Sequence, residues 1–203
     1  MPLLEAEPRA FPDTLFSDPA GIGSTDGSWW VLYTRARMEK SLARQLRAHA
    51  IPFYLPLYQH TWKTGGRKRT SFLPLFPGYV FLHGDESARI TALETNLLCS
   101  VLPVKDQQRL FNDLCRVECV LGGSAPVTPE TDVPTGALVE VTAGSFRGLC
   151  GKVIRRGTET RLVVEVEFLR RGVSIEIEEW ALRVLPTSAS PAASRPQLVP
   201  ALI

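Results

Sequence analysis

The chain has 203 residues, of which 44% are hydrophobic and 22% charged, and its formal net charge is +2. This composition is ordinary for a soluble globular protein with room for two compact domains, and no apolar run reaches the roughly 18 residues of a membrane span. The first residues lack a basic stretch followed by an apolar core, so we expect no secretory signal and a cytoplasmic location.

The small net charge hides an uneven distribution. Between Trp29 and Gly84 there are nine lysines and arginines but a single acid, Glu39, whereas the two signs nearly balance afterwards. A local excess of positive charge favours an anionic partner, such as nucleic acid or an acidic protein face.

The residue types that carry catalysis or bind metals do not form a recognisable pattern. Cys115 and Cys119 are four residues apart, but no CxxC pair or nearby histidine pair accompanies them. The three histidines are scattered, and no nucleophile–base pair, phosphate-binding loop or carboxylate pair is evident. We therefore expect no metal, no cofactor and no enzymatic activity, with the cysteines acting as small buried apolar side chains.

Three segments rich in Pro, Gly, Ser and Thr divide the chain. We expect a disordered N-terminal extension over residues 1–27, a flexible linker over 122–135 and a disordered tail over 186–203. Two folded domains then remain, over 28–121 and 136–185.

The first domain reads as an α+β arrangement around one antiparallel sheet. Pro56 predicts an edge position or a bulge in an extended segment, and Gly65-Gly66 predicts a hairpin turn in a basic run. The predicted strands are 29–34, 53–62, the GYVFL segment 78–82 and 98–104, and the predicted helices are 38–49, 86–93 and 106–121.

The second domain has a different texture. Segments such as LVEVTA, GKVIRR, RLVVEVEFL and VSIEIE alternate apolar with polar residues, which is the period of half-buried strands. Five short strands separated by glycines predict a small closed or nearly closed barrel.

This second domain contains the run GALVEVTAGSFRGLCGKVIRR, which resembles the KOW motif. The matching residues are Gly144, Phe146, Gly148, Gly151 and Val153. Two of these glycines allow tight chain reversals, and Gly151 allows two strands to approach closely. The alternative is a generic SH3-like barrel without a partner.

The first domain resembles the NusG N-terminal (NGN) domain. The resemblance lies in WWVLYTRARMEK, in the helix after it and in RKRTSFLPLFPGYVFL, where a basic hairpin precedes the turn Phe76-Pro77-Gly78-Tyr79. Because an NGN-like half is followed by a KOW-like half, the chain is identified as a member of the NusG family of transcription elongation and antitermination factors. The implied fold is an α+β NGN domain followed by a small all-β SH3-like KOW barrel.

The resemblance implies that the NGN domain binds the clamp helices of the largest RNA polymerase subunit. The residues expected at this contact form an apolar, aromatic group: Trp30, Leu75, Phe76, Pro77 and Tyr79. An apolar patch on a small domain often marks a partner site. The alternative is that these aromatic side chains belong to the core.

The basic hairpin is the second expected surface, through Lys63, Arg67, Lys68 and Arg69. In the family, this hairpin faces the polymerase lobe and lies near upstream or non-template DNA. Cations on a protruding turn neutralise phosphates without reading sequence. The alternative is a solvated charged loop.

For the KOW half, the resemblance implies contact with a small-subunit ribosomal protein or with Rho, and Phe146, Leu149 and Phe168 are the expected contact residues. The RTSFLPLFPGYVFL segment is closer to operon-specific paralogues resembling RfaH than to the general factor. The β-branched, alternating second domain nevertheless predicts a stable barrel without refolding into helices. We expect the chain to be a monomer. The alternative to a polymerase-bound elongation factor is a KOW-containing RNA- or ribosome-binding protein without a polymerase role.

Overall fold

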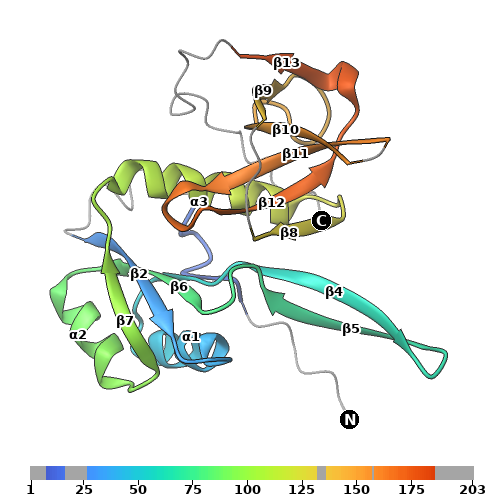
Figure 1. Ribbon diagram of the computed structural model, residues 1–203. Helices are drawn as coiled ribbons and strands as arrows, with labels where there is room; N and C mark the ends of the chain where they lie inside the picture. The colour runs from blue at the N-terminus through green and yellow to red at the C-terminus, as the bar shows by residue number, and fades with distance from the viewer. Residues whose placement is uncertain (1–7, 17–26, 132–135, 157, 186–203) are drawn as a thin grey trace. The chain divides into compact units, whose positions relative to one another are not determined.

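The computed structural model describes residues 8–16, 27–131, 136–156 and 158–185 (Figure 1). The chain divides into two compact units, with the boundary between Gln107 and Gln108. None of the helices within the described ranges is long and apolar enough to cross a membrane.

The first unit is built on a five-stranded antiparallel sheet in the order β1-β3-β6-β2-β7. Two helices accompany the sheet, and both match the predicted ranges closely. The bounds are β1 Ala10–Phe11, β2 Ser28–Thr34, α1 Glu39–Ala48, β3 Phe53–Tyr54, β6 Tyr79–Gly84, α2 Glu86–Glu94 and β7 Leu98–Pro103.

The two faces of this sheet are covered differently. Both helices contribute to one apolar cluster, in which Leu42 and Leu46 of α1 and Ala92 of α2 join Leu32 and Leu82 of the sheet. We call this side the helix face. The opposite side carries three cross-strand pairs and is called the aromatic face: Trp29 with His83, Val31 with Phe81, and Tyr33 with Tyr79.

Part of the expected N-terminal extension belongs to this sheet. Strand β1 pairs with β3, and the Leu55 amide donates to the Arg9 carbonyl at 2.7 Å. Phe16 packs edge-to-face on Tyr54, with the ring centroids 4.7 Å apart, and Leu15 is buried. Residues 8–16 therefore differ from the expected disorder because they supply apolar side chains to the sheet. The rest of the expected extension and the tail 186–203 lie outside the described residues.

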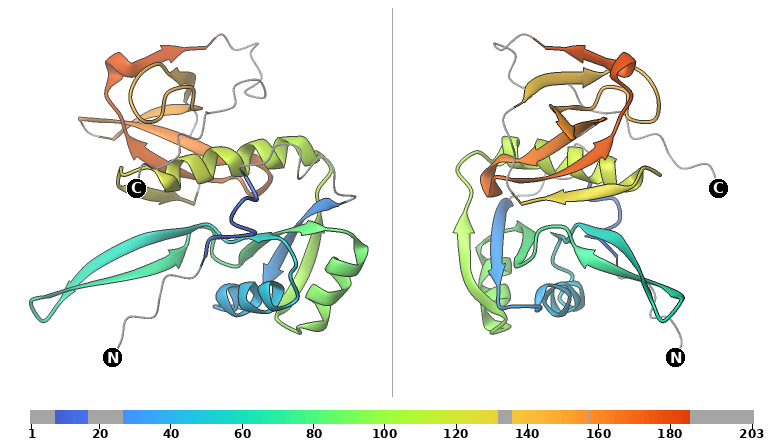
Figure 2. Two further views of the ribbon diagram at one scale, coloured as in Figure 1. Left: turned by 180° about the vertical axis from the view of Figure 1, so that it is seen from behind. Right: turned by 45° about the vertical axis from the view of Figure 1, so that its right-hand side comes forward.

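The extended segment 53–62 breaks into two strands at Leu55-Pro56. Strand β3 stays in the sheet, whereas β4 (Leu57–Thr64) leaves it and pairs with β5 (Arg67–Pro74) in a separate two-stranded ladder. The two residues between them, Gly65 and Gly66, have φ values of 56° and 74°. Positive φ at both positions is what a two-residue hairpin turn requires, so the predicted hairpin is confirmed. Figure 2 shows the hairpin extending away from the five-stranded sheet.

The second unit contains most of α3 (Gln107–Gly122) and a six-stranded antiparallel sheet in the order β13-β9-β10-β11-β12-β8. The alternating pattern correctly predicted that this region forms strands. The bounds are β8 Val127–Glu130, β9 Ala137–Val141, β10 Cys150–Arg156, β11 Glu159–Val166, β12 Arg171–Glu176 and β13 Leu182–Val184, with short 3-10 turns at Glu167–Leu169 and Glu179–Ala181.

Helix α3 was expected to complete the first domain, but most of it lies in the second unit. The Asp113 carboxylate accepts a hydrogen bond from the Glu167 amide at 3.0 Å, and Arg109 forms an ion pair with the Glu167 carboxylate. Burial raises the pKa of Asp113 to about 6, against the opposing effect of Arg116 and Arg109. Polar contacts of this kind could not be read from the apolar periodicity of the helix.

Strand β8 lies inside the segment expected as a flexible linker, 122–135. It pairs with β12 from Gly172↔Glu130 to Ile175↔Val127. The sheet therefore has six strands where five were expected, because the connector adds one. Residues 132–135 of the expected linker lie outside the described residues.

Candidate functional site

The FPGY turn is held from within the first unit. The Tyr79 amide donates to the Phe76 carbonyl at 3.0 Å, and Gly78 between them has φ +86°, which a residue with a side chain rarely adopts. Both polar groups of the Gly78 backbone have partners: its amide donates to the Glu39 carboxylate at 2.7 Å, and its carbonyl accepts from the Thr34 amide at 2.8 Å. The turn is therefore fixed to the start of α1 and the end of β2.

Two tyrosines present rings at the surface beside this turn. Tyr33 is 42% exposed, Tyr79 is half-buried, and their ring centroids are 5.3 Å apart. A Cβ atom at Gly78 would lie 3.0 Å from the Tyr33 ring, so glycine is needed there for space as well as for backbone conformation. Pro77 is also exposed. We call Tyr33, Pro77 and Tyr79 the tyrosine patch.

Two of the predicted contact residues in the turn are inaccessible. Leu75 is 2% exposed and Phe76 is 1% exposed, and Phe76 packs edge-to-face on Phe81 at 6.1 Å between centroids. The prediction that Phe76 is a surface anchor is therefore wrong, because its ring is part of the packed aromatic face.

Trp30 does not join Phe76 and Tyr79. Its register places it opposite Leu82 on the helix face, while Tyr79 lies on the aromatic face. The Trp30 ring packs against the apolar cluster, and the Arg89 guanidinium lies 5.6 Å from its centroid. Grouping Trp30 with the turn was therefore wrong. Tyr33, not Trp30, lies beside Tyr79 at the turn. The alternation along β2 indicates that Trp30 and Tyr33 point to opposite faces, but only the register with β6 decides which face meets the turn.

The hairpin carries all four predicted cations, and each of them is exposed. Lys63 lies opposite Lys68, and Arg67 and Arg69 lie opposite Thr64 and Trp62. No acidic residue occurs between Leu57 and Pro74. The hairpin surface is therefore positive.

An aromatic ladder follows one face of the same hairpin. Tyr58, His60 and Trp62 alternate along β4, with ring centroids 6.3 Å apart for the first pair and 5.7 Å apart for the second, which is stacked. Trp62 is 38% exposed, and its cross-strand neighbour is Arg69. This ladder was not among the residues predicted from the sequence, although the period-2 spacing of its rings is a recognisable signal.

A shallow pocket of about 550 Å³ lies elsewhere in the first unit, lined by residues that include His49, His83, Asp85 and Thr91. Burial lowers the pKa of His83, and a hydrogen bond to the Gly27 backbone opposes this shift. In the described part of the chain, no group of three or more His, Cys, Asp or Glu side chains is arranged to hold a metal ion.

In the second unit, the KOW-like residues surround one loop and the following strand. Gly144 and Gly148 have φ values of 78° and 84°, as the predicted reversals require. A Cβ atom at Gly151 would lie 2.5 Å from the Val163 carbonyl oxygen, which confirms the predicted close approach of strands. Val153 is half-buried in β10, and the half-buried Phe146 ring lies over Gly123, where a Cβ atom would lie 2.5 Å from it.

The expected contact residues of this unit differ in exposure. Leu149 is fully buried, so its assignment as a surface contact is wrong. Phe168 is 40% exposed. Trp180, which our sequence analysis did not select, is 75% exposed.

Comparison with known proteins gives a family for the first half of the chain. Residues 27–123 match the family model described as transcription termination factor nusG. No curated protein matches the chain.

Several solved structures are similar to the chain at low identity. One, describing domain interaction in Thermotoga maritima NusG, is 16% identical with a TM-score of 0.45, and the match covers 79% of this chain and 98% of that one. Conformation A of the MjSpt4:Spt5 complex is 17% identical with a TM-score of 0.24, covering 77% of this chain and 97% of that one. Conformation B of the same complex is 16% identical with a TM-score of 0.26, and the match covers 77% of this chain and 96% of that one.

The family model spans β2 to the end of α3 and includes the FPGY turn and the basic hairpin. Residues 27–123 of this chain are therefore a NusG-family domain.

Proposed function

We propose that this chain is a transcription elongation factor that docks on the clamp helices of RNA polymerase through the tyrosine patch. A NusG-family domain supports a non-enzymatic role in transcription elongation. The observation that carries the proposed docking site is the ring pair of the exposed Tyr33 and the half-buried Tyr79, beside a turn whose backbone is fixed by Glu39.

The chemistry of the patch suits a helical protein surface. Tyrosine contributes apolar ring area and one polar group at low entropic cost, and aromatic side chains are favoured interface anchors. Arg35 and Arg37 are exposed just after β2, so acidic side chains on the partner would find counter-charges nearby. Both rings are already partly covered in the free chain, so each would contribute less than the roughly 1.5–3 kcal/mol of a fully exposed side chain that becomes buried. Micromolar affinity corresponds to about 8 kcal/mol, so neighbouring contacts must supply the rest.

We further propose that the hairpin contacts upstream or non-template DNA beside the polymerase lobe. Its cations and its ladder of Tyr58, His60 and Trp62 combine the two features of single-strand binding surfaces, a positive track and stacking platforms. This combination supports suppression of pausing and termination by a factor that bridges the polymerase cleft.

The second unit supplies the proposed contact with a small-subunit ribosomal protein or Rho. Phe168 and Trp180 are its exposed aromatic candidates. Restriction to particular operons, as in paralogues resembling RfaH, rests on the sequence of the FPGY segment, and an adjacent long biosynthetic operon would support it.

Retention on immobilised core polymerase tests the docking site. The double variant Tyr33→Ala/Tyr79→Ala should lose at least about tenfold in affinity. Trp180→Ala is the matched control, because it removes an aromatic side chain that is even more exposed from the other unit, and it should be retained like the wild type. Equal retention of the double variant and the control would reject the tyrosine patch as the docking site.

The second candidate function is RNA binding without polymerase contact, which the aromatic ladder favours. It predicts strong binding to single-stranded RNA and no retention on polymerase for either variant or wild type. The same retention experiment therefore separates the two functions.

A further inference from the structure

The edge of β12 is occupied by a short strand from the chain's own connector. β8 pairs with β12 over four residue pairs, and β8 is the last strand on that side of the sheet. Its third residue is Pro129, which has no amide hydrogen and is typical of an edge strand.

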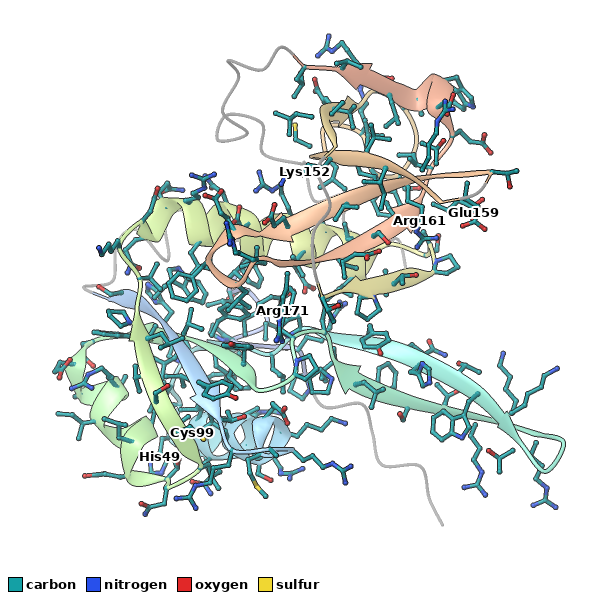
Figure 3. All side chains as sticks on the ribbon, viewed as in Figure 1. His49, Cys99, Lys152, Glu159, Arg161 and Arg171 are labelled. Carbon is teal, nitrogen blue, oxygen red and sulfur yellow. The ribbon has the colours of Figure 1, made fainter. Side chains whose placement is uncertain are left out.

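This strand is held by polar side chains. The Ser174 hydroxyl donates to the Glu130 carboxylate at 2.6 Å, and the Arg161 guanidinium donates to the Thr128 hydroxyl at 2.8 Å and to the Ser174 hydroxyl at 3.0 Å. Ser174 is fully buried and Glu130 is 5% exposed. In Figure 3, Arg161 and Glu159 lie close together on β11, and Arg161 also bonds the Glu159 carboxylate at 3.3 Å.

Strand β8 contributes no fully buried apolar side chain to the core of the sheet. The only buried residue of β8 is the charged Glu130, and Val127, Thr128 and Pro129 are half-buried. The buried apolar strand residues of this sheet all come from other strands: Val139, Val141, Cys150, Leu162, Val163, Val164, Val166, Val173 and Ile175. Departure of β8 would leave the half-buried Arg161 and the buried Ser174 without two of their acceptors.

From this arrangement we infer that the β12 edge is a strand-docking site and that β8 is its built-in occupant. The partner it fits is an extended peptide that carries Ser or Thr followed two residues later by Asp or Glu. Alternate residues of a strand point to the same side, so such a peptide reproduces Thr128 and Glu130.

Charge decides which peptide fits. The half-buried guanidinium of Arg161 donates to the Thr128 hydroxyl, and the buried hydroxyl of Ser174 donates to the Glu130 carboxylate, so the peptide must supply both acceptors. A lysine at the Glu130 position would place a second cation in the same buried seam and exclude the strand. The exchange of β8 for a partner strand would also free the connector between the NusG-family domain and the C-terminal sheet.

The inference does not rest on polymerase binding and is tested on the full chain. The variant Thr128→Ala/Glu130→Lys weakens the built-in strand, and a fluorescent peptide of residues 124–131, SAPVTPET, is the probe. The peptide should bind this variant at least about tenfold tighter than it binds the wild type, whose edge is occupied. The peptide SAPVAPKT should not bind, and adding Ser174→Ala to the variant should weaken binding of SAPVTPET.

Three results would overturn the inference. One is equal binding of SAPVTPET to wild type and variant; another is no binding to the variant up to about 1 mM while circular dichroism shows its strands intact. The third is a wild-type chain that sediments as a dimer and becomes a monomer with Glu130→Lys, because the occupant would then be a second copy of β8.

Hydrogen exchange of the wild type covers the case in which the variant does not fold. A partner strand can replace β8 only if β8 opens locally, so the amides of Val127, Thr128 and Glu130 should exchange at least about tenfold faster than those of the β10–β11 ladder. Exchange of β8 at the same rate as β10 and β11 would make it a fixed strand and overturn the inference.

Discussion

The FPGY turn and the β4–β5 hairpin belong to the same unit, and both have aromatic residues close to glycines in the sequence. Their structures are opposite in kind. The turn is anchored by the buried Glu39 and exposes only a few side chains, whereas nearly every side chain of the hairpin beyond Tyr58 is exposed. A binding surface on the turn therefore depends on exact placement, and one on the hairpin depends on the sum of its charges and rings.

This difference has consequences for substitutions. At the turn, a buried residue that touches no partner can alter binding, because it sets the backbone on which the tyrosines sit. On the hairpin, each exposed side chain acts almost independently. The contribution of a cation to binding should fall as the salt concentration rises, whereas that of an aromatic ring should not change with salt.

The largest effect is expected at Glu39. Glu39→Ala removes the acceptor of the Gly78 amide, and leaving such a group unpaired costs about 1–3 kcal/mol. We expect a lower melting temperature and roughly tenfold weaker binding to core polymerase, measured by biolayer interferometry. Glu39→Gln is the matched control, because its amide oxygen can still accept the bond, and it should fall between alanine and wild type. Identical binding by all three proteins would show that the turn does not need this anchor.

A medium effect is expected from the hairpin cations. Arg67→Gln/Lys68→Gln should weaken binding to a single-stranded oligonucleotide and make the slope of log K against log salt shallower by about 1.4, since each phosphate contact contributes about 0.7. Trp62→Ala is the contrasting variant; it should weaken binding without changing the slope, because stacking releases few counterions. Fluorescence anisotropy over a salt series measures both. An unchanged slope in the double variant would mean that these cations do not meet phosphates.

The sequence predicted the elements of the first unit well because their signals are local. The apolar period of α1, the Gly65-Gly66 turn and the GYVFL strand each depend on neighbours within a few residues. What it could not supply was register. Trp30 and Tyr33 are both aromatic and lie on one strand, and only the pairing with β6 decides that Tyr33 meets Tyr79 while Trp30 faces the helices.

The sequence predictions were also wrong for two segments that were assigned as linker or disordered from their composition. The stretch around Val127–Glu130 is rich in Pro and Thr, which is typical of linkers, and the stretch around Phe11–Phe16 lies in a Pro- and Asp-rich terminus. Both join sheets through partners far away in sequence, Ser174 for Glu130 and Tyr54 for Phe16. Composition reports the average tendency of a segment, and a single long-range contact with a buried group can override it.

The smallest effect is expected from pH, and it separates the sheet that carries the turn from the hairpin. His83 is buried on the aromatic face beside Trp29, and burial lowers its pKa below the ordinary value of 6.5. The unfolded chain therefore binds a proton more readily, so this contribution to stability is fully present above pH 6.5 and is lost as the pH falls through the lower pKa of the folded state.

Urea unfolding followed by tryptophan fluorescence at a series of pH values from about 7 to about 5 tests this. His83→Gln does not titrate and can still donate to the Gly27 backbone, so the wild type should lose more stability than this variant over that range. His60→Gln is the matched control for the loss of a histidine side chain, because it removes an exposed histidine from the hairpin of the same unit. Carboxylates titrate in all three proteins, so the difference between them isolates the histidine. If wild type and His83→Gln lost stability in parallel, burial of His83 would not make the stability of the chain depend on pH.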